Sequence, residues 1–148
     1  MISPMENLGP SVDIALLADS VQAVGGKLFV LGGGWDTLFV PSFPARHPSL
    51  GIGLRIRVPT SSMSEGMTID VDLQDADGNS LLPKPLRHPV RLNRDRQPED
   101  ATDVGIVRAF TLNNLQFREP GFYSFVISLD DEPRSRLRFR VTERPRRS

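Results

Sequence analysis

Cysteine is absent from this chain, and histidine and tryptophan are scarce: the 148 residues include 2 histidines and 1 tryptophan. Without cysteine there are no disulfide bonds and no thiolate metal sites. The two histidines each precede a proline in separate predicted loops, which is a weak basis for a metal centre. The sequence therefore gives no reason to expect a cofactor.

Long apolar runs are missing as well. The longest, Ile14 to Ala18, is far too short to cross a bilayer. The first residues lack the basic start and the long apolar stretch of a signal peptide. We therefore expect a cytoplasmic protein that does not associate with membranes.

Neither sign of charge dominates, because 18 basic and 18 acidic residues give a formal net charge of zero. This balance argues against a general attraction to nucleic acid or to anionic lipid. Arg136, Arg138 and Arg140 alternate along one predicted strand. One interpretation is that these arginines form an outward stripe that contacts an anion or a partner. The alternative is a charged edge strand that discourages aggregation. Since Phe139 is expected to face inward, the stripe lacks the aromatic groups that stack on single-stranded nucleic acid.

Helical periodicity is also missing, because no stretch has the i, i+3, i+4 spacing of a long helix. Apolar and polar residues instead alternate along short segments, with turn signals roughly every 8 to 12 residues. This pattern predicts an antiparallel β-sandwich of about eight strands, either immunoglobulin-like or of a jelly-roll or C2-like kind. We expect a single domain over residues 11–142, with a flexible leader at 1–10 and a flexible basic tail at 143–148.

Two alternating segments carry the strongest strand signal. Leu50 to Val58 and Met67 to Leu73 are joined by a short polar loop, which predicts an antiparallel hairpin. Matching their apolar faces pairs two arginines with two aspartates on the solvent side, namely Arg55 and Arg57 with Asp70 and Asp72.

An earlier segment, Ser11 to Asp19, alternates with the same period. Alanine and leucine also favour a helix, but the period of two favours a strand. Its apolar side is expected to consist of Val12, Ile14, Leu16 and Ala18.

Three consecutive glycines interrupt the apolar stretch from Lys27 to Leu38 and are followed by Trp35. We expect a strand that breaks at the glycines and restarts, with Trp35 packed at the corner against the core. A phosphate-binding loop is excluded, because the lysine and the Ser/Thr that follow its glycines are missing. The alternative is an exposed indole beside Asp36, which would form a platform for a ligand such as a carbohydrate.

Four aspartates suggest a calcium hypothesis, because clustered carboxylates are what this cation requires. Asp75 and Asp77 lie in one predicted turn, and Asp130 and Asp131 lie in another. The glutamate that ends an EF-hand loop is missing, so the hypothesis is a C2-like site that joins the two turns. The alternative is that Asp75 to Asn79 forms an ordinary hairpin turn.

A corner near the end of the chain, Leu115 to Phe125, is similar to the tyrosine corner of immunoglobulin-like domains. Tyr123 takes the position of the conserved tyrosine, and Phe125 stands where those domains often carry cysteine. The cysteine–tryptophan–cysteine spacing of antibody domains is absent.

The whole pattern also resembles a family of uncharacterised bacterial single-domain proteins. Five blocks carry the resemblance: Gly26-Lys27-Leu28, Gly32 to Asp36, His47-Pro48, Asp75 to Gly78 and Pro120 to Phe125. The resemblance implies a compact β domain over roughly Val12 to Val141. It implies no activity and no catalytic residue.

No arrangement of residues in the sequence predicts catalysis, since there is no Gly-x-Ser-x-Gly elbow and no acid/base pair at a defined spacing. We therefore expect a non-catalytic module that binds a protein partner, including a second copy of itself. Outward-facing Phe122 and Val126 are candidates for a subunit contact. The alternative is a module that binds carbohydrate at Trp35 and Asp36, or Ca²⁺ at the Asp75 and Asp77 turn.

Overall fold

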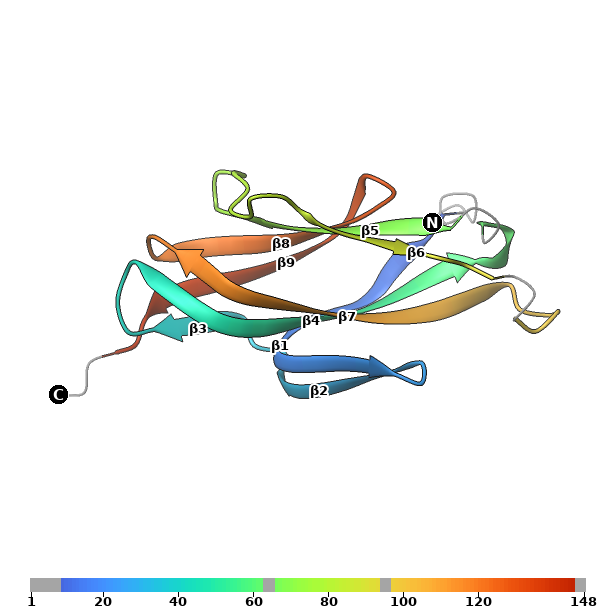
Figure 1. Cartoon of the computed structure of the whole chain (residues 1–148), viewed down its shortest axis with the longest axis horizontal. Helices are drawn as coiled ribbons and strands as arrows, with labels where there is room; N and C mark the ends of the chain where they lie inside the picture. The colour runs from blue at the N-terminus through green and yellow to red at the C-terminus, as the bar shows by residue number, and fades with distance from the viewer. Residues whose placement is uncertain (1–8, 63–65, 94–96, 146–148) are drawn as a thin grey trace, which may run out of the picture.

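The computed structural model describes residues 9–62, 66–93 and 97–145. They form a β-sandwich of two sheets, one of four strands and one of five (Figure 1). The predicted all-β sandwich is therefore confirmed, with nine strands in the described chain. Their bounds are β1 Ser11–Val24, β2 Lys27–Gly33, β3 Thr37–Val40, β4 Ala45–Pro59, β5 Met67–Gln74, β6 Leu86–Val90, β7 Asp103–Phe117, β8 Gly121–Leu129 and β9 Glu132–Glu143.

The strand order places the chain with immunoglobulin-type sandwiches. The sheets run β2-β1-β4-β7 and β3-β9-β8-β5-β6. The parts β1-β4-β7 and β9-β8-β5-β6 correspond to the A-B-E and G-F-C-C′ strands of that fold. One pair departs from the antiparallel expectation, because β3 runs parallel to β9.

Alternating side chains fill the space between the two sheets. The apolar rows predicted on β4 and β5 are buried, and so is the alternating row of β8, Tyr123, Phe125, Ile127 and Leu129. On β9, Phe139 and Val141 are buried and Leu137 packs partly buried against the core. Burying an aliphatic or aromatic side chain contributes about 1.5–3 kcal/mol, so these rows supply the main driving force for folding.

An aromatic cluster closes one part of the core around Phe139. The ring of Phe139 stacks on Phe125 with centroids 5.4 Å apart and meets Trp35 edge to face at 6.2 Å. Phe117 and Tyr123 complete the cluster. Tyr123 donates a hydrogen bond of 2.5 Å to the carbonyl oxygen of Glu119, which is the backbone contact expected of a tyrosine corner. Burial raises the pKa of Tyr123 above its usual value.

The predicted hairpin between Leu50–Val58 and Met67–Leu73 is wrong. β4 pairs with β1 and β7, whereas β5 pairs with β6 and β8 in the other sheet. A short 3-10 turn, Thr60–Ser62, follows β4 before the chain enters the opposite sheet. The charged partners differ accordingly: Arg55 lies near Asp13, Arg57 near Asp13 and Asp103, and Asp70 near Arg87.

The predicted facing of the first strand is correct for Val12, which packs against the core, and wrong for Ile14 beyond it. The pairing of β1 with β4 shifts between Val12 and Ile14, which leaves Asp13 as the extra residue of a bulge. Beyond the bulge the alternation changes phase. Ala15 and Leu17 therefore pack against the core, and Ile14 is exposed.

The ends of the predicted domain fall mostly outside the described residues. The expected leader at 1–10 is described only at Gly9 and Pro10. β9 runs to Glu143, so the first residue of the expected tail belongs to the last strand. Residues 146–148 of that tail lie outside the description.

Candidate functional site

A long hairpin projects from the four-stranded sheet. Ala18 is the last residue of β1 that pairs with β4, and beyond it β1 pairs only with β2. Gly25 and Gly26, with φ of 60° and 74°, form the two-residue turn that joins the strands. Figure 1 shows the hairpin as a further layer outside the sandwich, with β2 on the side of β1 away from β4 and β7.

Two glycines on β4 let the hairpin approach the sheet closely. Gly51 and Gly53 point outward, opposite to the core-facing row, yet both are buried. A Cβ at Gly51 would lie 3.0 Å from the backbone nitrogen of Val21, and one at Gly53 would lie 3.2 Å from a methyl of the same residue. Val21 is accordingly only 4% exposed. The root of the hairpin is therefore held by direct contact between backbones.

The hairpin exposes several large apolar side chains to solvent. Of nine large apolar side chains exposed in the described chain, four lie between residues 24 and 31: Val24, Phe29, Val30 and Leu31. Leu31 is 73% exposed and Phe29 is 55% exposed. In the register of the hairpin, Val24, Phe29 and Leu31 share one face. Such a concentration of apolar side chains at the surface is typical of an interaction site.

The edge of β2 is also less protected than the other sheet edges. β3 has only four residues, β6 contains Pro89, and on β7 Arg108 donates a 2.8 Å hydrogen bond to the carbonyl oxygen of Val107 in its own strand. Short strands, prolines and charged side chains all discourage pairing with another chain. The seven residues of β2 include no proline and a single charge, Lys27.

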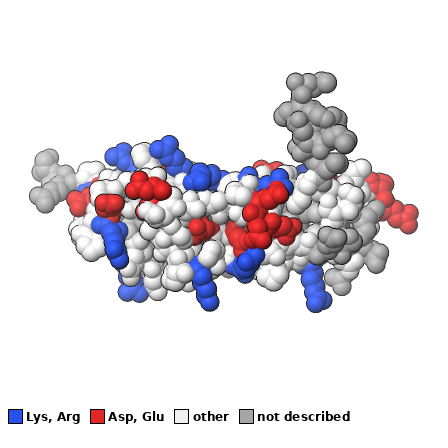
Figure 2. Space-filling model, turned by 90° about the horizontal axis from the view of Figure 1, so that it is seen from above, with Lys and Arg blue, Asp and Glu red and all other residues white. Residues whose placement is uncertain are grey.

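The outer face of the five-stranded sheet carries the arginine stripe. Figure 2 shows basic side chains along one side of this face and acidic side chains gathered near its middle. Arg136, Arg138 and Arg140 are all exposed, and the guanidinium carbon of Arg138 lies 4.0 Å from the centre of the Phe122 ring. The two residues proposed for a subunit contact differ, because Phe122 is 45% exposed whereas Val126 is only 7% exposed.

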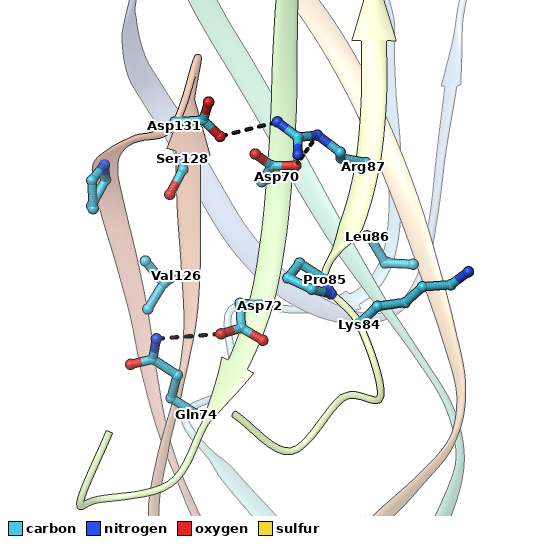
Figure 3. Close-up of a pocket in the computed structure, with 11 residues that line it drawn as sticks. Asp70, Asp72, Gln74, Lys84, Pro85, Leu86, Arg87, Val126, Ser128 and Asp131 are labelled. Carbon is cyan, nitrogen blue, oxygen red and sulfur yellow. Dashed lines mark hydrogen bonds and ion pairs between the residues drawn. The ribbon is translucent and has the colours of Figure 1, made fainter. Parts of the chain in front are cut away.

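A groove of about 810 Å³ lies on the same face, over β5. Figure 3 shows Asp70, Asp72 and Gln74 along its floor, with Arg87 reaching across from β6. Arg87 lies 3.3 Å from Asp70 and 3.0 Å from Asp131, so it pairs with both carboxylates. One oxygen of Asp70 is buried in this ion pair without a hydrogen bond. The charged groups of the groove thus mainly satisfy one another.

Trp35 takes the corner position predicted from the sequence. It is partly buried and packs against the core, while its indole nitrogen is buried without a hydrogen-bond partner. Asp36 is exposed and accepts a 3.0 Å hydrogen bond from the hydroxyl of Thr37. The indole therefore does not form an open platform beside the carboxylate, although binding of a carbohydrate there stays a prediction.

The structure does not bring the four predicted calcium ligands together. Asp130 accepts a 2.9 Å hydrogen bond from the backbone N–H of Thr68, at the start of β5. Asp75 follows the end of the same strand, and at about 3.3 Å per residue the two turns lie roughly 20 Å apart. Among the described residues, no three acidic, histidine or cysteine side chains form a group that would hold a metal ion.

Asp75 instead stabilises its own turn. One carboxylate oxygen accepts hydrogen bonds of 2.9 Å from the backbone N–H groups of Asp77 and Asn79. The other accepts one of 3.3 Å from the side chain of Asn79. These bonds, led by the backbone N–H of Asn79, hold the pKa of Asp75 below its usual value of 3.8. This is the ordinary turn that the sequence offered as the alternative to a metal site.

This turn predicts a pH-dependent loss of stability in Asp75→Ala. Because the pKa of Asp75 is lower in the folded than in the unfolded chain, its stabilising effect is present above the unfolded pKa and disappears as the pH falls through the folded pKa. Asp75→Ala should therefore melt below the wild type at pH 7, and the two melting curves should converge at strongly acidic pH. Asp77→Ala keeps every acceptor on Asp75 and should show no such convergence. A difference between wild type and Asp75→Ala that is the same at all pH values would contradict this account.

The fold and the exposed hairpin define the class of protein: a small immunoglobulin-like β-sandwich with an apolar hairpin on its outer face. The chain belongs to a family of unknown function (DUF6941), whose profile matches residues 13–142. No curated protein matches the chain. No helix in the described ranges combines the length and the apolar character needed to cross a membrane.

Two solved structures show a distant likeness. A β-glucosidase from Listeria innocua is 15% identical, with a TM-score of 0.37, over 72% of this chain and 14% of the enzyme. The Pseudomonas fluorescens alkylpurine DNA glycosylase AlkC, bound to DNA containing an abasic site analog, is 7% identical, with a TM-score of 0.38, over 86% of this chain and 30% of that protein. This chain therefore spans well under two thirds of either protein, and neither likeness is close enough to bear on its function.

Proposed function

We propose that this domain is a non-catalytic interaction module that binds a protein partner through the β1–β2 hairpin. The observation that carries the proposal is the grouping of exposed apolar side chains, Val24 and Phe29 to Leu31, on an element held outside the sandwich. Removing these side chains from water would contribute roughly 25 cal/mol per Å² to binding. The anchored root of the hairpin supports the same role, because a preorganised surface loses little conformational entropy on association.

The proposal includes the absence of catalytic activity. The contacts that the carboxylates make support this part of it. In the groove over β5, Arg87 pairs with Asp70 and Asp131, and Asp72 accepts hydrogen bonds from Ser80 and Gln74. The carboxylate of Asp75 is held by backbone N–H groups. General acid–base catalysis needs a group that is placed to exchange a proton with a substrate. Carboxylates already engaged in ion pairs and turns are poorly suited to that task.

A photo-cross-linking experiment tests the interaction surface. A photoreactive phenylalanine analogue is placed at Phe29 in one variant and at Phe39 in another, since the two rings are similarly exposed, at 55% and 49%. Both variants are produced in cells that naturally make the protein and are irradiated there. We expect a discrete adduct from position 29 and none of comparable yield from position 39. Equal yields, or no adduct at position 29, would refute the proposal.

A further inference from the structure

We propose that the partner of the hairpin is a second copy of this chain, joined by antiparallel pairing of β2 with β2 about a two-fold axis. This inference rests on the proposed function and specifies its partner. The pairing would extend each two-stranded hairpin into a shared four-stranded sheet, with one sandwich at each side.

The backbone of β2 is the first reason. β2 ends the strand order of its sheet, so no other strand of the described chain pairs with the N–H and C=O groups of its outer edge. Six of its seven residues are exposed, whereas Leu28 is half-buried on the face turned toward Gly53 of β4, so the outer face and the edge of β2 are open. In the strand order β1 separates β2 from β4 and β7, and Figure 1 draws β2 as the outermost strand of the hairpin. A strand is the ligand that satisfies such an edge.

The side chains favour pairing centred on Phe29. In this register Phe29 lies opposite Phe29 of the second copy, Leu28 opposite Val30, and Lys27 opposite Leu31. All five positions precede Gly32, where φ of 63° interrupts regular strand geometry. Facing aromatic and aliphatic side chains each contribute about 0.2–1 kcal/mol across a strand pair. The two Lys27 ammonium groups lie at opposite ends of the pairing, so no like charges meet.

Charge and symmetry favour a second copy over an unrelated strand. The formal net charge of zero means that two copies do not repel one another at long range. In a two-fold arrangement each β2 satisfies the other, so the assembly closes as a dimer and leaves no new free edge. An unrelated partner would instead need its own apolar strand of matching length and its own unprotected edge.

The apolar area that β2 exposes limits the affinity of the dimer. Covering Phe29, Val30 and Leu31 on each copy would bury on the order of 300–400 Å² per chain, which is below the roughly 800 Å² per partner of a standard stable interface. We therefore expect a dimer in rapid exchange with monomer, assembling at micromolar concentration.

Sedimentation velocity over a range from 1 to 500 µM, as a rough span for a weak interface, tests the dimer and its register. The wild type should shift from monomer to dimer as its concentration rises. Phe29→Lys and Phe29→Glu each place two like charges together on the axis, and each alone should weaken dimerisation by roughly tenfold or more. An equimolar mixture of the two variants should recover a dimer, because opposite charges then meet at that position.

Phe39→Lys is the matched control, because it makes the same change at a similarly exposed ring on the other sheet, and it should dimerise as the wild type does. Far-ultraviolet circular dichroism checks that all variants fold. A wild type that stays monomeric at the highest concentration would overturn the inference, and a mixture that fails to recover the dimer would overturn the pairing about Phe29. If the adduct at position 29 then holds a different protein, the interaction module stands and only the identity of its partner fails.

Discussion

Phe139→Ala is expected to lower the free energy of unfolding by about 3–5 kcal/mol, the usual cost of deleting a buried aromatic side chain. Phe139 is 1% exposed and contacts four other rings of the aromatic cluster, on β7, β8 and the Trp35 corner. The cavity is lined by rings from several strands, so it cannot be closed by moving one side chain. Urea unfolding followed by the fluorescence of Trp35, the only tryptophan, measures the loss directly.

Phe39→Ala is the matched control for this effect. Phe39 lies on β3, the strand that pairs with β9, but its ring is 49% exposed on the outer face of the same sheet. Its removal should cost well under half as much, because exposed substitutions usually stay within about 0.5 kcal/mol. Equal losses in the two variants would mean that Phe139 is not the centre of the packed cluster.

Gly51→Val is expected to lift the hairpin from the sheet and to cost about 1–3 kcal/mol, as overpacking of a tight contact does. Even a Cβ at this position would lie 3.0 Å from the backbone nitrogen of Val21, so a flexible side-chain end cannot relieve the clash. A protease specific for lysine provides a local measurement, because the chain has only two sites, Lys27 at the hairpin turn and Lys84 in a loop. Cleavage after Lys27 should accelerate relative to cleavage after Lys84.

Gly105→Ala is the control for the general effect of replacing a glycine in the four-stranded sheet. The atoms nearest to a Cβ there would be those of the Arg55 guanidinium group, the first at 2.8 Å, and this flexible group can move aside. The relative cleavage at Lys27 should therefore match that of the wild type. If the ratio of cleavage at Lys27 to cleavage at Lys84 is unchanged in Gly51→Val, the position of the hairpin does not depend on close contact at Gly51.

The sequence predicted which side chains face the core far better than it predicted which strands are neighbours. Alternation along Leu50–Val58 reports only that one face is apolar, and this holds for any partner strand. Whether the chain turns back into the same sheet or crosses to the other depends on contacts far apart in sequence, such as those of β4 with β7. The bulge at Asp13 was not predicted for a related reason. A bulge reverses which residues of a strand face the core, but it leaves the amino-acid composition of the strand unchanged.

The candidate site was only partly visible in the sequence. Lys27 to Leu31 was expected as a strand, and Trp35 was placed correctly at the corner, although β2 continues through Gly32 and Gly33 and ends one or two residues later than expected. The exposure of Phe29 and Leu31 was missed, because a run of consecutive apolar residues is usually a strand buried on both faces. One available signal was the pair Gly51 and Gly53 on the outward face of β4, where missing side chains allow another backbone to come close.

The position of β9 in its sheet has a consequence for the order in which the protein folds. β9 is the last of the described strands and lies between β8 and β3, so the five-stranded sheet stays divided until β9 is added. Phe139, on that strand, contacts rings that are synthesised earlier and must wait for it. We therefore expect a nascent chain to keep two unpaired sheet edges and an incomplete core until the twelve residues of β9 have left the ribosome.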